Sequence, residues 1–180
     1  MKRGKFKFLK LLNEYRSLSY ELEYVKEVLA EGHLEFEEYY RSWCLENDVD
    51  LGSLNKKNQR KVDMVFIEEK SHKMKQDLAL IEFKKEREEK GEDFKHIYKA
   101  VARKLHPDTL AEGDPRKQEY EDAFKKAAAA NNNGKWGEFF DVVDRYNIKL
   151  QDYKSAISCL RFDIERIEKE LKKEKSTYSW

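Results

Sequence analysis

The sequence of 180 residues is poor in residues that break helices, with two prolines and seven glycines. Because Pro removes a backbone donor and Gly has low helix propensity, their scarcity favours long helices. Cysteine is also scarce. Cys44 and Cys159 lie too far apart to match a zinc-binding or redox motif. We expect free thiols in a reducing compartment, while the sequence leaves a disulfide between them open.

An excess of charge of one sign is missing as well. The chain has 37 basic and 36 acidic residues, a net charge of +1, so bulk attraction to nucleic acid or to a membrane surface is not expected. No apolar run approaches the length that spans a bilayer. The basic N-terminus is interrupted by Lys10, Asn13 and Glu14, which excludes the apolar segment of a signal peptide. We therefore expect a cytoplasmic protein without a membrane partner.

What the sequence does contain is charge and helical periodicity. Charged residues make up 41% and aromatic residues 13% of the chain, and a chain with so many aromatic residues is not expected to be disordered. No segment shows the alternation typical of strands. The predicted fold class is all-α, with long helices that carry charged outer faces.

Two heptad seams, with apolar residues spaced alternately three and four apart, predict coiled-coil helices at the two ends of the chain. They can bury each other as an antiparallel pair, or each can pair with the same seam of a second copy in a homodimer. Gly32 is predicted to interrupt the first helix, before a second helix with an aromatic core-facing side. The first seam is Phe8, Leu11, Tyr15, Leu18, Leu22, Val25 and Leu29, the aromatic side is Phe36, Tyr39, Tyr40, Trp43 and Cys44, and the last seam is Leu150, Tyr153, Ile157, Leu160, Ile164, Ile167 and Leu171.

A loop is predicted over Asn47–Asn58, followed by a long helix from about Gln59. This helix repeats the heptad spacing and is predicted to end at Gly91, after which Asp93 can cap the next helix. Its seam consists of Met64, Ile67, Ser71, Met74, Leu78 and Ile81.

The next helix is predicted over residues 94–105, with one apolar and one basic face. The following segment, HPDTLAEGDP, contains two prolines and a glycine and is predicted to be a loop. A helix is then expected from Pro115 to the run of asparagines before Gly134, and a short helix with Trp136 and Tyr146 after it. The apolar face is Phe94, Ile97, Tyr98, Val101, Ala102 and Leu105.

The segment FKHIYKAVARKLHPD at residues 94–108 resembles the second helix and the signature loop of a J-domain. Members of that family stimulate the ATPase of seventy-kilodalton heat-shock chaperones. The resemblance implies a J-domain-like helical unit at residues 60–147, between an N-terminal helical or coiled-coil region at 1–59 and a C-terminal coiled-coil helix at 148–180. The chain departs from the family in lacking a Leu-Gly pair before this helix, a Gly/Phe-rich linker and Cys-x-x-Cys repeats.

The resemblance implies a partner-binding site on the basic helix and in the loop after it. Pro107 forces the helix to end near Leu105 and stiffens the turn that displays His106 and Asp108. A carboxylate can pair with an arginine of a partner, and an imidazole can donate or accept hydrogen bonds. The implied site residues are Lys95, Lys99, Arg103, Lys104, His106, Pro107 and Asp108. Their implied partner is the chaperone ATPase.

Two other functions are consistent with the sequence. The chain can be a coiled-coil scaffold or adaptor whose J-like unit is inert, or a nucleic-acid-binding protein that uses the basic face at 95–104, a role disfavoured by the acidic residues around it. An enzyme is not expected, since Cys44 and His33 have no orienting third group. His96 and His106 lack a third ligand at metal spacing, and no glycine-rich phosphate loop occurs. No metal or cofactor is predicted.

Overall fold

The computed structural model describes residues 2–89, 95–150 and 153–176. This part of the chain is entirely helical apart from turns, and the predicted all-α fold is confirmed. Its elements are α1 (Lys2–Glu46), α2 (Leu51–Glu89), α3 (Lys95–Leu105), the 3-10 turn η1 (Pro107–Thr109), α4 (Lys117–Asn133), α5 (Trp136–Arg145) and α6 (Lys154–Glu174).

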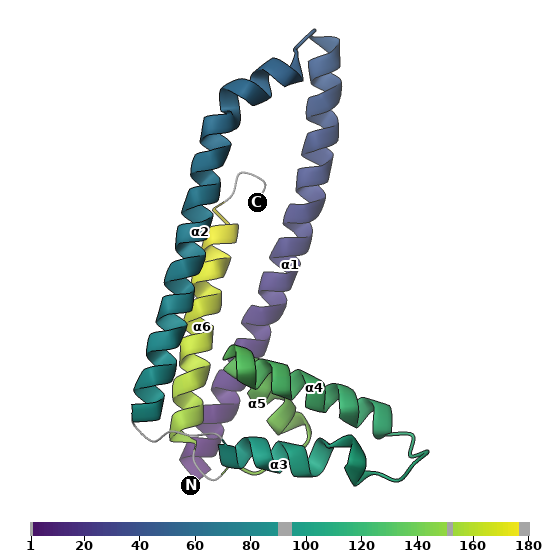
Figure 1. Cartoon of the computed structure of the whole chain (residues 1–180), viewed down its shortest axis with the longest axis vertical. Coiled ribbons are helices and arrows are strands. Elements are labelled where there is room, and N and C mark those ends of the chain that lie inside the picture. The colour runs from purple at the N-terminus through teal and green to yellow at the C-terminus, as the bar shows by residue number, and fades with distance from the viewer. Residues whose placement is uncertain (1, 90–94, 151–152, 177–180) are drawn as a thin grey trace.

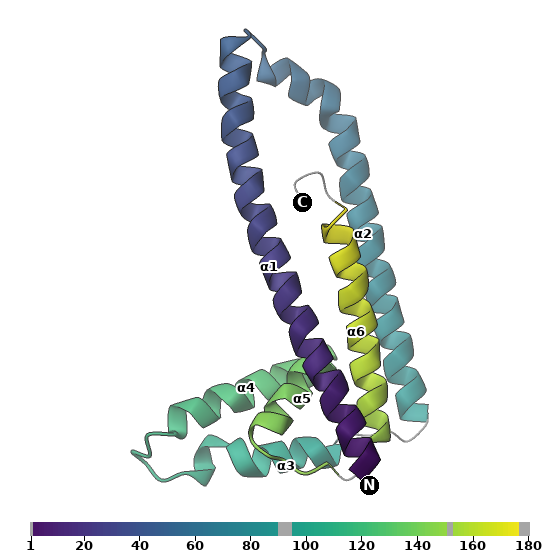
Figure 2. The ribbon, with the colours of Figure 1, turned by 180° about the vertical axis from the view of Figure 1, so that it is seen from behind.

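The molecule has the shape of an L (Figure 1). The long arm consists of α1, α2 and the shorter α6, and the view from behind shows that α6 lies beside α2 (Figure 2). The foot of the L contains the hairpin of α3 and α4, which extends sideways from the base of the arm. Helix α5 lies at the junction, between the hairpin and the arm.

Helix α1 runs for 45 residues without a break, so the predicted interruption at Gly32 is wrong. One glycine costs a helix only about 1 kcal/mol relative to alanine, and the residues around it are good helix formers. What changes near Gly32 is the extent of burial, because Leu29 is buried and Leu34 is exposed, and beyond Gly32 only Cys44 of α1 is buried among the described side chains. Most of the predicted aromatic core farther along α1 is also exposed, including Tyr39 and Trp43.

The predicted loop over Asn47–Asn58 is wrong except for its first four residues. Asp48, with φ of 50°, lies in the turn that follows α1. Asp50 then starts α2, because its Oδ1 accepts a hydrogen bond from the Gly52 amide at 2.9 Å, as an N-cap residue does. The two predictions on Gly91 and Asp93 lie outside the described residues.

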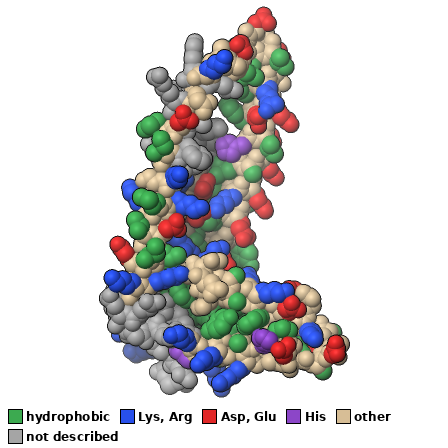
Figure 3. Space-filling view, viewed as in Figure 1, with side chains coloured by type: hydrophobic (Ala, Val, Ile, Leu, Met, Phe, Trp, Pro, Cys, Tyr) green, Lys and Arg blue, Asp and Glu red, His purple; other side chains and the backbone are tan. Residues whose placement is uncertain are grey.

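The seam of α2 is not buried by the rest of the chain. Its large apolar members are all exposed, and hydrophobic side chains dot the outer edge of α2 in the space-filling view (Figure 3). We call this seam the α2 stripe. It consists of Met64, Ile67, Ser71, Met74, Leu78 and Ile81.

The terminal seams do bury each other within one chain, but α1 and α6 run parallel, which corrects the antiparallel prediction. Near their starts, the rings of Phe8 and Tyr153 lie 5.7 Å apart. Farther along both helices, the Lys26 ammonium pairs with the Glu170 carboxylate at 2.5 Å. The direction follows from connectivity, since α2 returns the chain to the base of the arm and α5 delivers it to the start of α6.

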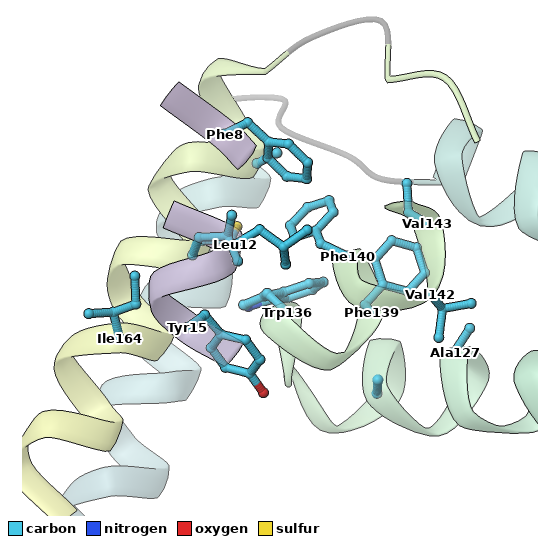
Figure 4. Packing of buried hydrophobic residues seen from close by; sticks show 14 of the residues in the cluster. Phe8, Leu12, Tyr15, Ala127, Trp136, Phe139, Phe140, Val142, Val143 and Ile164 are labelled. Carbon is cyan, nitrogen blue, oxygen red and sulfur yellow. The ribbon is translucent and has the colours of Figure 1, made fainter. Parts of the chain in front are cut away.

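The core lies where α1, α5 and α6 meet the α3–α4 hairpin (Figure 4). Phe139 and Phe140 of α5 are fully buried, and Phe8 packs edge-on against Phe140 at 5.6 Å. Arg16 of α1 fixes α5 from outside with ion pairs to Asp141 and Asp144 at 2.8 and 2.9 Å. The position of the hairpin therefore depends on both terminal helices.

The predicted boundary between residues 59 and 60 falls inside α2, and the one between 147 and 148 falls in the turn after α5. Among the described helices, none has an apolar stretch long enough to cross a bilayer.

Candidate functional site

Helix α3 is anchored by one apolar face, as its periodicity predicts. Ile97, Val101 and Leu105, spaced four apart, are all buried. Tyr98 adds a ring contact with Phe124 of α4, at 6.2 Å between ring centroids. These contacts fix the rotation of α3, and so determine which of its side chains face outward.

The opposite face of α3 carries the predicted cations. Lys95, Lys99 and Arg103 are all exposed, and basic side chains gather over α3 in the space-filling view (Figure 3). Within the described part of the chain, no carboxylate lies within ion-pair distance of Lys99 or Arg103. Lys104 is exposed too, but its ammonium donates a hydrogen bond to the backbone carbonyl of Tyr146, which ties α3 to the end of α5.

The His106-Pro107-Asp108 segment forms a tight, hydrogen-bonded turn directly after α3. The His106 amide donates to the Ala102 carbonyl at 2.9 Å and so completes the helix. The His106 carbonyl in turn accepts two bonds from Thr109, from the amide at 2.9 Å and from the hydroxyl at 2.6 Å. Pro107 fills the first position of η1, where a missing N–H costs nothing. The segment is therefore held in a defined conformation.

The imidazole of His106 is supported on one side and open on the other. Its ring lies edge-on to Phe124 with 5.3 Å between centroids, and its side chain is 44% exposed. Nδ1 lies 3.4 Å from both the Asp108 amide and the Asp108 carboxylate. These contacts are alternatives, because a neutral Nδ1 accepts from the amide and a protonated one donates to the carboxylate. Both are long and therefore weak.

Asp108 is the most open member of the turn, since its side chain is 87% exposed. Its carboxylate can thus accept both hydrogen bonds of a guanidinium from another molecule.

Sequence reasoning missed two residues that support the turn, Thr109 and Phe124. A hydroxyl three residues after His106 is a local signal for the first, whereas the second depends on how α4 packs.

The far end of the loop is held by charge. Both carboxylate oxygens of Asp114 accept hydrogen bonds from the Arg116 guanidinium, at 3.1 and 2.9 Å. These hydrogen bonds lower the pKa of Asp114 to about 2. The Arg116 guanidinium also lies over the ring of Tyr120 at 5.9 Å. Next to Tyr120, the Tyr146 hydroxyl donates a hydrogen bond to the Glu119 carboxylate at 2.7 Å. Burial raises the pKa of Tyr146 to about 12.

The seven predicted site residues thus lie on one continuous region, along α3 and around its C-terminal end. The region offers exposed cations, an imidazole and an exposed carboxylate to a partner surface. The described residues contain no group of three or more His, Cys, Asp or Glu side chains that could hold a metal ion. Comparison of the chain with family models, curated proteins and solved structures finds no match.

Proposed function

We propose that this chain is a J-domain-like co-chaperone, which docks on a seventy-kilodalton heat-shock chaperone and stimulates its ATPase. The observation that carries the proposal is the ordered, exposed turn of His106, Pro107 and Asp108 directly after a helix with a basic face. In J-domains the same order of a basic helix and this tripeptide forms the chaperone-binding surface. The family resemblance and the geometry of the turn both support the proposal, and both rest on residues 94–108.

The role of each part follows from its chemistry. The α3 cations attract an acidic surface and speed association. Asp108 then pairs with a basic group of the chaperone, and the His106 imidazole adds a directional hydrogen bond. The turn is already ordered before contact, so little conformational entropy is lost on binding.

The test is a steady-state ATPase assay with a purified seventy-kilodalton chaperone. Wild-type protein is expected to raise the rate severalfold, and His106→Gln and Asp108→Asn are each expected to abolish the increase. His33→Gln is the matched control, because His33 is exposed on α1, far from the turn. No stimulation by the wild type, or equal stimulation by His106→Gln, rejects the proposal.

A scaffold or adaptor is the second candidate. The outer part of α1 favours it, because Phe36, Tyr39 and Trp43 are exposed there and offer apolar surface to another protein. Such a protein has no need of the chaperone contact. The scaffold hypothesis therefore predicts that Asp108→Asn leaves the biological activity of the chain intact.

A further inference from the structure

The α2 stripe is an apolar surface that the chain itself leaves uncovered. Its five large apolar side chains are between 50% and 60% exposed, although they follow one another along a single helix face over nearly five turns. Contiguous exposed apolar surface of this kind marks an interaction site in natural proteins. The terminal seams with the same spacing are buried against each other, so spacing alone does not explain the difference.

The stripe faces away from the rest of the molecule. On the other side of α2, Phe83 stacks on Phe162 of α6 with ring centroids 4.2 Å apart. Ile81, two residues before Phe83, is turned by about 200° around the helix axis. A partner helix can therefore approach the stripe without displacing α6.

The spacing of the stripe is suited to another helix. Its members alternate steps of three and four residues over three heptads, the pattern in which side chains of one helix fit between those of a second. With Met64, Ser71 and Leu78 at the a positions, the d positions are Ile67, Met74 and Ile81. The residues that border the stripe then decide which helix fits and in which direction.

The bordering charges are complementary to a second copy in antiparallel orientation. Two antiparallel helices bring g positions opposite g positions. When Ser71 of one copy faces Met74 of the other, Lys70 of each copy lies opposite Asp77 of the other. Both of these contacts pair exposed side chains of opposite charge.

The competing arrangements bring like charges together. A parallel dimer places g positions opposite e positions, so Lys70 faces Lys75 and Asp77 faces Glu82. An antiparallel dimer shifted by one heptad brings either the two Lys70 residues or the two Asp77 residues together. Like charges at such positions disfavour a pairing.

We propose that the α2 stripe is a homodimer interface, in which two copies of this chain pair along α2 in antiparallel orientation with Ser71 of one copy facing Met74 of the other. Six layers of mainly apolar side chains are buried, and the bordering charges fix direction and register. This interface does not depend on the proposed chaperone contact, and either proposal can fail alone.

The first test is the solution mass, measured by light scattering from micromolar to millimolar concentrations. Wild-type protein is expected to reach twice its chain mass of 21.6 kDa. Leu78→Lys is expected to remain a monomer, because it places two charges in the apolar layers. Leu34→Lys, at an exposed apolar position outside the stripe, is the matched control and is expected to dimerise. A monomeric wild type throughout, or dimerisation of Leu78→Lys, overturns the proposal.

The second test addresses orientation by exchanging charges. Lys70→Asp and Asp77→Lys, taken singly, each make both of these contacts repulsive and are expected to weaken dimerisation by roughly tenfold. The double variant is expected to recover the wild-type dimer constant, and so is an equimolar mixture of the two single variants. Circular dichroism verifies that each variant is folded. Absence of recovery in both cases contradicts the antiparallel register.

Discussion

Asp163 of α6 places a carboxylate inside the core, beside the first turn of α5. Its Oδ2 accepts a hydrogen bond from the Gly137 amide at 2.7 Å, and the Arg166 guanidinium lies 3.2 Å from Oδ1 without hydrogen-bond geometry. Desolvation by burial outweighs these partners and raises the pKa of Asp163 to about 6. The residue therefore positions α5, but its burial makes ionisation less favourable than it is for an aspartate in water.

A pH-dependent stability difference follows for Asp163→Asn. Between the ordinary pKa of 3.8 and about 6 the folded state binds more protons at this site than the unfolded state, so this residue lowers stability as pH rises. Relative to wild type, the variant is expected to gain roughly 2 kcal/mol between pH 4 and pH 7.

Urea unfolding of both proteins at the two pH values measures this gain. Every other carboxylate is common to the two proteins, so its contribution cancels in the difference. A stability difference that does not change with pH contradicts the assigned pKa.

The structural roles of some single residues could be predicted from the sequence, and those of others could not. Pro107 has a local effect on its own helix end, so the turn around it was predictable. Phe124 under His106 and Asp163 under α5 act across the fold, and nothing in their sequence neighbourhood indicates which element they meet. Gly137 is of the second kind too, since a Cβ there would lie 2.2 Å from the Tyr15 ring.

Among the elements, α3 was predicted most closely because its apolar face, its basic face and its proline stop all lie within fifteen residues. The boundaries of α1 and α2 were mispredicted because Gly32 and the Asn-rich start of α2 are weak signals that neighbouring turns of helix override. The direction of α1 relative to α6 has no local signal, since a heptad seam fits a partner in either orientation.

Reversing two charges on α3 tests whether the basic face of this helix contributes to the chaperone contact. Lys99→Glu with Arg103→Glu is expected to reduce stimulation of the chaperone ATPase by roughly tenfold at low salt, because attraction to an acidic surface becomes repulsion. The reduction is expected to shrink as salt screens the charges.

The matched control is Lys10→Glu with Lys56→Glu, which changes net charge equally at exposed positions on other helices. Equal losses in the two double variants would mean that overall charge, and not the α3 face, controls the interaction.

At the scale of the whole molecule, the hairpin and the arm share one core. Phe8 and Leu12 of α1 and Leu160 and Ile164 of α6 are buried in the cluster that also contains α5. The fragment 60–147 lacks all of them, so it is expected to lose cooperative unfolding in urea, followed by circular dichroism.

A full chain cut by protease at an engineered site in the turn between α1 and α2 is the control. It retains every core side chain and is expected to unfold cooperatively. A cooperative transition for the fragment alone would mean that the hairpin and α5 are an autonomous unit.

The parallel pairing of α1 with α6 also sets the order of events during translation. Helix α1 leaves the ribosome more than a hundred residues before the segment that covers its apolar side. Until α6 emerges, Phe8 and Leu12 have no native partner on that side, and the nascent chain carries an uncovered apolar surface. The core of this protein is therefore completed late in synthesis, when its last helix meets its first.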